Sequence, residues 1–242
     1  MAVSWEDRAI VLSVRRHGEH DAITTVFGAE RGRFSGMVKG GAGRRNRGLL
    51  QPGNLLQVSW RARLEDQLGT MTCEPQRMIA GDTLGDRRGL AALSAMCAML
   101  EACLPEREPH PGLFEDSLAA LSAFASTESP SLYARWELAL LREIGFGLDL
   151  SACGVTGVTE GLVFVSPRSG RAVSREGAGS YAERLLRLPS FLLADAIAPT
   201  ITETEIDEAL RLTGHFFEAH VFAPHDRRVP AARTRFVDLA KS

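Results

Sequence analysis

The chain has 242 residues, of which 45% are hydrophobic and 24% charged, and its formal net charge is −2. These values are typical of a globular protein with a packed core, and the length allows one large domain or two ordinary ones. No apolar run approaches the roughly 20 residues that a membrane helix needs, and the early charges of MAVSWEDRA indicate that it is not a signal peptide.

The charge is unevenly distributed along the chain. Residues 1–80 hold twelve Lys/Arg against eight Asp/Glu, a net of +4, so the remainder carries sixteen against twenty-two, a net of −6. This asymmetry suggests different partners for the two parts. The four cysteines form no CxxC pair, which favours a reduced protein of the cytoplasm.

The first part of the chain reads as strands. Five short apolar or β-branched runs occur without a helix between them: 8–14, 22–28, 33–40, 54–60 and 67–74, the last ending at Pro75. Such a series fits a small closed barrel, and we expect a five-stranded OB-type β-barrel over residues 1–78. Its face on strands 2 and 3 and its loops commonly bind oligonucleotides.

The third of these runs begins a basic stretch, RGRFSGMVKGGAGRRNR, with no acid among its cations: Arg31, Arg33, Lys39, Arg44, Arg45 and Arg47. Its first half alternates as a strand does, whereas GGAGRRNR is expected to be a flexible loop. Cations beside glycines bind phosphates in a sequence-tolerant way. The alternative is a solvated basic loop. Arg15, Arg16 and His17, before the second strand, extend the patch under the first interpretation.

Phe34 is the single aromatic residue among these cations. Stacking on a base is one possible role. Its alternation with Gly36 and Val38 instead favours the barrel interior, and Trp60 at the end of a strand is expected in the core as well.

The remainder, 79–242, is expected to be a helical bundle domain, so the chain as a whole is α+β. Helical periodicity begins at Asp82, resumes over 113–125, and starts again at Ser129-Pro130, where a cap precedes a proline. A β-hairpin is expected at 162–165 and 171–174, inside an insert at 148–180. Helices follow at 181–197, at 204–223 and in AARTRFVDLA.

Several segments together resemble the RecO family of bacterial recombination mediators: AIVLSVRRHGEHDAITTVFGAERGRFSGMVKGG, GLLQPGNLLQV, WELALLREIGFGLDLSACGVTG and LRLTGHFFEAHVFAP. The resemblance implies an OB barrel, a helical domain and a hairpin region that is a zinc finger in some members. It implies binding and annealing of single-stranded DNA, with duplex DNA as a further ligand, and RecA loading on DNA covered by single-strand-binding protein in the RecF pathway. RecR and the acidic C-terminal tail of single-strand-binding protein are the implied partners, and a nucleoid-associated place in the cytoplasm is the implied location.

The hairpin region departs from the zinc-binding pattern of two CxxC pairs. Cys153 stands at the first ligand position, but the others hold Thr156, Ser174 and Gly177. One thiolate cannot hold zinc, which takes about four S or N ligands. We therefore expect the same hairpin without metal, stabilised by apolar packing of Leu162, Phe164 and Val173.

No GxSxG, HExxH, P-loop lysine motif or paired GxGxxG occurs, so we expect no enzymatic activity, no catalytic residue and no cofactor. The competing hypothesis is a protein–protein adaptor that acts mainly through its helical domain, with incidental DNA contact. The residues that would bind protein partners are not indicated by the sequence.

Overall fold

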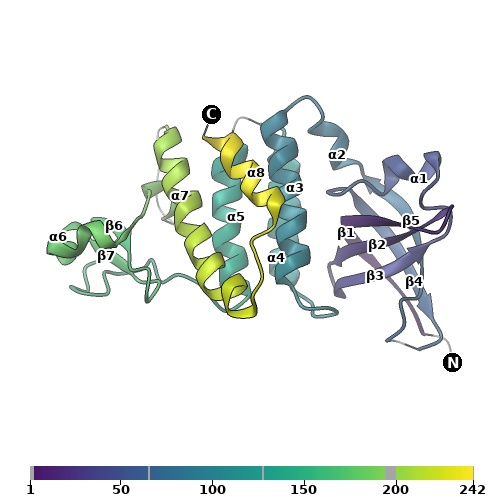
Figure 1. Cartoon of the computed structure of the whole chain (residues 1–242), viewed down its shortest axis with the longest axis horizontal. Helices are drawn as coiled ribbons and strands as arrows, with labels where there is room; N and C mark the ends of the chain where they lie inside the picture. Colours follow the sequence, from purple (N-terminus) through teal and green to yellow (C-terminus); the bar gives the residue numbers. More distant parts are fainter. Residues whose placement is uncertain (1–2, 65, 127, 194–199, 242) are drawn as a thin grey trace. The chain divides into compact units, whose positions relative to one another are not determined.

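The structure is a computed structural model that describes residues 3–64, 66–126, 128–193 and 200–241. It is a mixed α+β fold (Figure 1). The chain divides into two compact units, Met1–Ser129 with Pro230–Arg233, and Pro130–Val229 with Thr234–Ser242. The first unit includes helices that follow the strands, and the expected domain boundary at residue 78 stays a prediction. In the described residues, no helix is both long and apolar enough to cross a bilayer.

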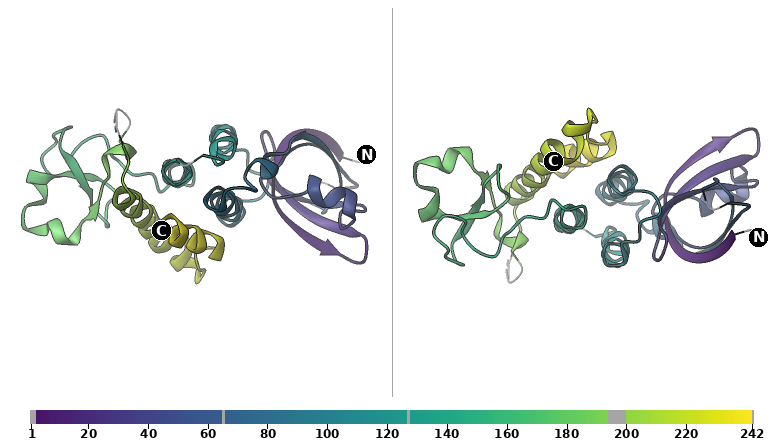
Figure 2. Two further views of the ribbon diagram at one scale, coloured as in Figure 1. Left: turned by 90° about the horizontal axis from the view of Figure 1, so that it is seen from above. Right: turned by 90° about the horizontal axis from the view of Figure 1, so that it is seen from below.

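The first unit contains a closed five-stranded sheet. Its strands follow the order β1-β2-β3-β5-β4, so that every strand has two neighbours, and they appear as a ring in Figure 2. The pairings are antiparallel, except that β3 and β5 run parallel. The strand bounds are β1 Val3–His17, β2 Asp21–Gly28, β3 Gly32–Val38, β4 Leu55–Ala62 and β5 Thr70–Arg77.

Two strands extend past the limits expected from the sequence. β1 begins at Val3 because its N-terminal half pairs with β4, while its C-terminal half pairs with β2. β5 continues through Pro75 to Arg77, so the end expected at Pro75 was wrong. Pro75 faces Leu56 where the register with β4 shifts, and such an irregularity tolerates a residue without an N–H.

The barrel encloses an apolar core, which includes Phe34 and Trp60 as expected. Its buried residues are Ala9, Val11, Val26, Phe34, Val38, Leu50, Leu56, Val58, Trp60 and Met71. They come from all five strands and from the end of a short helix, α1 (Arg44–Leu49). Strand alternation places every second residue inside, so the outer residues stay available for other contacts.

Helix α1 corrects the expectation that GGAGRRNR is entirely loop and that no helix follows its glycines. The side-chain amide of Asn46 donates to the carbonyl of Gly40 at 3.0 Å, at the start of the helix. The amide of Asn54 donates to the carbonyls of Gly48 and Leu49, both at 3.0 Å, at its end. These side-chain bonds pair backbone groups that a single turn leaves unsatisfied, and burial of Leu50 fixes the helix on the barrel.

Three helices complete the first unit: α2 Ile79–Asp82, α3 Arg87–Cys103 and α4 Pro111–Ala123. Asp86 caps α3 by accepting the N–H of Arg88 at 2.9 Å, so the long helix begins there rather than at Asp82. α3 contacts β1, where Ser13 donates to Glu101 at 2.7 Å. α4 reaches β2 through the rings of Phe27 and Phe114, whose centroids are 5.6 Å apart.

The second unit is built on helices α5 (Ser129–Glu143, from Pro130 onward), α7 (Glu203–Phe216) and α8 (Ala231–Ala240, from Thr234 onward). The hydroxyl of Thr213 donates to Glu137 at 2.6 Å, and both residues are fully buried. The helix expected over 204–223 ends earlier, because π-type turns replace α-helical ones from Phe217 to Phe222. Apolar residues spaced three and four positions apart do not distinguish π-helical from α-helical turns, so the sequence did not indicate this change.

The hairpin of the second unit is present, with strands β6 (Leu162–Val165) and β7 (Ala172–Ser174). A third strand, β8 (Leu186–Arg187), adds to β6, and the short helix α6 (Arg175–Ala178) follows β7. The helix expected at 181–197 is wrong where it is described: 3-10 turns and β8 occupy Gly179–Leu192, and 194–197 lie outside the described residues. Leu162, Phe164 and Val173 are buried, as expected.

Candidate nucleic-acid interface

The basic stretch does not form one surface, because β3 carries it along the length of the barrel. Arg31 precedes the strand at the turn where Gly32 pairs with Gly28, and Lys39 follows it where Val38 pairs with Ala22. At about 3.3 Å per residue, the eight steps between the two cations span roughly 25 Å. Arg31 and Lys39 therefore belong to opposite ends of the strand.

The cations at the Lys39 end are joined by those of the β1–β2 hairpin. Arg16 pairs with Ala22, which pairs in turn with Val38. Backbone bonds tie the hairpin tip to the segment before α1: Ala42 donates to the carbonyl of His20 at 3.0 Å, and Gly40 donates to the Asp21 carboxylate at 2.8 Å. We call the exposed cations gathered here the basic end: Arg15, Arg16, Lys39, Arg44 and Arg47.

Two acids also lie at the hairpin tip, Glu19 and Asp21. Asp21 is occupied by the N–H of Gly40, so it serves to hold the loop. The basic end still has five cations for these two acids. The side chain of Arg45, expected to belong to this group, lies outside the described residues.

Arg33 lies on the outer face of β3, but that face is covered there. Its Nε donates to the carbonyl of Leu104 at 2.8 Å, and its Nη1 is 3.4 Å from the carboxylate of Glu106. The backbone N–H of Arg107 donates to the carbonyl of Arg33 at 2.7 Å. The guanidinium of Arg33 is thus already bonded to the segment between α3 and α4. A phosphate contact by Arg33 stays a prediction and would have to displace these bonds.

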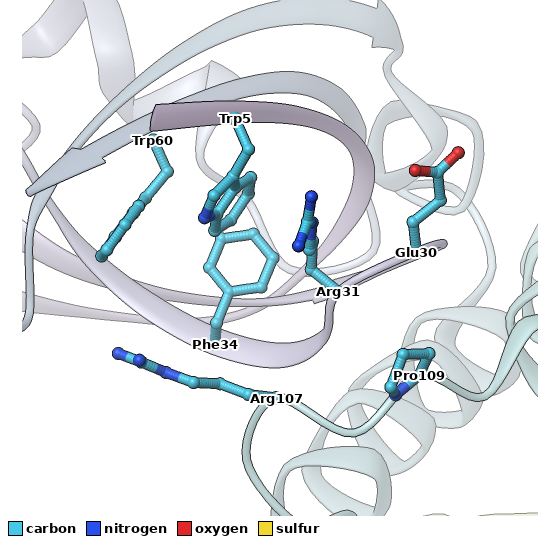
Figure 3. Close-up of a pocket in the computed structure, with 7 residues that line it drawn as sticks. All are labelled: Trp5, Glu30, Arg31, Phe34, Trp60, Arg107 and Pro109. Carbon is cyan, nitrogen blue, oxygen red and sulfur yellow. The ribbon is translucent and has the colours of Figure 1, made fainter. Parts of the chain in front are cut away.

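At the Arg31 end a cavity of about 100 Å³ opens beside the barrel core (Figure 3). We call it the mouth pocket, and its lining residues are Trp5, Glu30, Arg31, Phe34, Trp60, Arg107 and Pro109. Phe34 is only 3% exposed and meets Trp5 edge to face at 4.5 Å, which agrees with an interior position; its base stacking stays a prediction.

The sequence did not indicate Trp5 or Arg107 as site residues. Trp5 stands before the first strand expected from the sequence, although Val3, Trp5 and Asp7 continue its inward alternation. Arg107 follows a helix and carries no motif. Of these two residues, the sequence carries a signal for Trp5 alone, which is its spacing of two residues from buried strand positions.

Asp7 orders the turn that carries Arg31. It is 6% exposed, and its carboxylate accepts the N–H groups of Glu30 and Arg31 at 3.1 and 3.0 Å. Burial raises the pKa of Asp7, and these two hydrogen bonds act in the opposite direction. The carboxylate therefore fixes the backbone of the turn while the Arg31 side chain stays exposed.

The four positions compared with zinc ligands converge in the hairpin region. The thiol sulfur of Cys153 accepts the N–H groups of Ser174 at 3.2 Å and of Thr156 at 3.4 Å. The hydroxyl oxygens of Thr156 and Ser174 are 3.5 Å apart, and the N–H of Gly177 donates to the latter at 3.0 Å. One thiol and two hydroxyls are not a zinc donor set. Among the described residues, no three His, Cys, Asp or Glu side chains are grouped to hold a metal ion.

These hydrogen bonds change the acidity of the thiol. Burial raises the pKa of Cys153, but hydrogen bonds from Ser174 and Thr156 outweigh it and lower the pKa to about 6. The sulfur thus acts as an acceptor that ties the loop before β6 to the end of β7. The expected absence of zinc is a prediction that elemental analysis can test.

Comparison with known proteins gives matches over nearly the whole chain. The family described as "Recombination protein O N terminal" matches residues 1–76, and "Recombination protein O C terminal" matches 84–228. The DNA repair protein RecO of Rhodospirillum rubrum is 48% identical over 242 residues, covering 98% of this chain and 96% of the relative. Those of Cereibacter sphaeroides and a Ruegeria species are 49% and 48% identical, each alignment covering 98% of both chains.

Proposed function

The chain belongs to the RecO family of DNA repair proteins, and we propose that it mediates recombination by binding and annealing single-stranded DNA. It then assists RecA loading on DNA covered by single-strand-binding protein, in the RecF pathway. This role is non-enzymatic and belongs in the cytoplasm at the nucleoid. Holding strands in register requires no bond to be made or broken, so a binding surface is sufficient.

We propose that the barrel is of the OB type. The support is its order β1-β2-β3-β5-β4, with α1 between β3 and β4. OB barrels bind oligonucleotides through the face of strands 2 and 3 and through the β1–β2 and β4–β5 loops. Since the segment after α3 covers part of that face here, the β1–β2 side is the more open part. We further propose a domain boundary near residue 78 and a degenerate zinc-finger-like hairpin at 148–180.

The basic end is the observation that carries the proposal. Five exposed cations from β1, from the loop after β3 and from α1 lie at one end of the barrel. Phosphate contacts of this kind give tight binding that falls with salt and tolerates any sequence. They also weaken the repulsion between two complementary strands held together, which is what annealing requires.

The test is a titration of labelled single-stranded DNA at several salt concentrations. We expect Arg44→Ala/Arg45→Ala/Arg47→Ala to bind at least tenfold more weakly, and to lower the salt slope by about 2, since each lost contact contributes about 0.7. A matched control with the same charge change is Arg168→Ala/Arg175→Ala/Arg184→Ala, on exposed residues of the second unit. Equal affinity and slope for all three proteins would contradict the proposal.

RecR, the acidic tail of single-strand-binding protein and duplex DNA are the further partners that we propose from the family. The rival adaptor hypothesis predicts a different result for the same variants. If the helical domain carries the function, the basic-end variant should still promote RecA loading at the wild-type rate. We expect that rate to fall together with DNA affinity.

A further inference from the structure

The mouth pocket combines flat aromatic surface with positive charge. Trp5 and Trp60 are stacked with centroids 5.2 Å apart and ring planes 16° from parallel, and Phe34 closes the floor edge to face. Trp60 and Phe34 are 2% and 3% exposed, whereas Trp5 is half-buried. Figure 3 shows the three rings pointing toward one another inside the barrel. Trp5 is therefore the ring that a ligand can reach.

Two guanidinium groups lie over these indoles. Arg31 is 5.5 Å from the ring centroid of Trp5, and Arg107 is 5.8 Å from that of Trp60. Both arginines are exposed, and Glu30 is the acid that also lines the pocket. The pocket therefore carries an excess of positive charge beside aromatic surface.

The backbone conformation of Arg107 and its hydrogen bonds hold this residue in place. Its φ is +62°, an uncommon left-handed conformation for a residue other than glycine. Its backbone N–H donates to the carbonyl of Arg33. Its side-chain Nη2 donates to the carbonyl of Gln67 at 3.2 Å, which joins Arg107 to the β4–β5 loop. Strained residues that the surrounding structure holds in place concentrate at ligand-binding sites. The side chain is thus fixed at the edge of the pocket.

We propose that the mouth pocket receives one unstacked base of the bound single strand, an inference that rests on the proposed DNA-binding function. The base takes the face of Trp5 that Arg31 covers in the free protein, and Arg31 turns to the adjoining phosphate. A cavity of about 100 Å³ has room for one planar ring, since one water needs about 10–15 Å³ by this measure. A paired base cannot enter, so the pocket selects single strands.

The pocket and the basic end can belong to one binding path. They lie at opposite ends of β3, roughly 25 Å apart by strand rise. An OB barrel engages about 4–16 nucleotides, which is enough to cover that span. The basic end would then hold the backbone without regard to the bases, while the pocket detects that a base is present and unpaired.

The test compares two probes with the same phosphates: an oligothymidylate and a fully abasic oligonucleotide of equal length. The readouts are anisotropy of the labelled strand and tryptophan fluorescence in a Trp136→Phe background, in which both remaining tryptophans line the pocket. We expect the base-bearing strand to quench the fluorescence and to bind about 5-fold to 150-fold more tightly than the abasic one, the range measured for stacking one base on an aromatic residue.

Variants at Trp5 assign that preference to the pocket. Trp5→Leu should reduce the preference for the base-bearing strand to near unity, and Trp5→Phe, which keeps a flat ring, should retain most of it. Arg44→Ala/Arg47→Ala should weaken both strands equally and leave their ratio unchanged. A preference that survives in Trp5→Leu overturns the pocket assignment while leaving the DNA-binding function intact.

Two other outcomes also count against the proposal. Binding of neither strand at low salt would refute the proposed function together with the pocket. Quenching by an acidic peptide, without quenching by oligothymidylate, would show that the pocket takes a peptide, and the base assignment would be wrong.

Discussion

The barrel and the hairpin sheet satisfy the hydrogen-bonding groups at their strand edges in different ways. The barrel strands have seven to fifteen residues and close on one another around a buried core. The hairpin sheet is open, with β6, β7 and β8 of four, three and two residues in the order β7-β6-β8. The loop before β6 covers the outer edge of β7, where Ala172 donates to the carbonyl of Asp149 and accepts the N–H of Gly154, both at 2.8 Å. The same loop is also tied by hydrogen bonds to one sulfur, that of Cys153.

This difference determines which polar groups in each region are needed for folding. Because a closed sheet satisfies its own edges and buries its own core, its ends are free to hold cations that contribute nothing to folding. The smaller sheet buries few residues, so its polar groups are used to hold the loops together. We therefore expect substitutions to act on stability in the core and hairpin, and on DNA binding at the basic end.

The largest expected effect is that of Trp60→Ala. The ring is 2% exposed, stacks on Trp5, and donates from Nε1 to the carbonyl of Leu68 at 3.0 Å. Its loss should reduce the free energy of unfolding by about 3–5 kcal/mol, as measured for buried aromatic residues. Urea unfolding followed by circular dichroism measures this. Leu84→Ala, at a side chain 69% exposed, is the control. A loss below about 1 kcal/mol would contradict a barrel held by its core.

A smaller effect is expected where the helices meet the barrel, at Gly32. Gly32 has φ +66°, and a Cβ there would overlap the backbone of Glu108. Gly32→Ala should cost about 1–2 kcal/mol of backbone strain and a further amount for displacing the segment before α4. Gly18→Ala is the matched control, because Gly18 has φ +63° and nothing within 4 Å of a Cβ. Equal losses of stability for the two variants would show that the segment does not press on β3.

A pH-dependent effect is expected in the hairpin. Since the pKa of Cys153 is lowered to about 6 from its usual 9.0, the folded state favours the thiolate. Its contribution to stability is absent below pH 6 and grows as pH rises toward 9. The melting temperature of the wild type should therefore gain on that of Cys153→Ala by about 4–8 °C between pH 6 and pH 8, corresponding to about 2 kcal/mol.

Cys73→Ala is the control for this trend. Burial raises the pKa of Cys73 to about 12, so its thiol stays neutral in both states over the same range. The difference between the wild type and Cys73→Ala should stay constant from pH 6 to pH 8. A parallel course for the two variants would mean that Cys153 does not titrate as a stabilised thiolate.

The smallest effect on stability is expected at the basic end. Arg44→Ala/Arg47→Ala should change the free energy of unfolding by no more than about 0.5 kcal/mol, because exposed side chains without partners in the core contribute little. The same variant should lose DNA affinity and salt dependence. Thermal unfolding measured beside the DNA titration separates the two properties, and a large drop in melting temperature would show that these cations support the fold.

Much of the fold could be predicted from local pattern. Alternation in the first part indicated the five strands and the interior position of Phe34, and the turn at 166–170 indicated the hairpin. Both predictions rest on the two-residue period of strands, which can be recognised within a short stretch of sequence. The ends of β1 and β5 were missed because they depend on which strands they pair with.

By itself, the sequence determined the family, the strands of the barrel, most of the helices and the presence of a basic stretch. Only the tertiary structure decided that β3 separates Arg31 from Lys39, that the segment after α3 occupies Arg33, and that Arg107 completes a pocket around Trp5 and Trp60. The physical reason is that periodicity assigns a residue to a face of its own element. Closure of a barrel and packing of a helix against it depend on contacts between residues far apart in the chain.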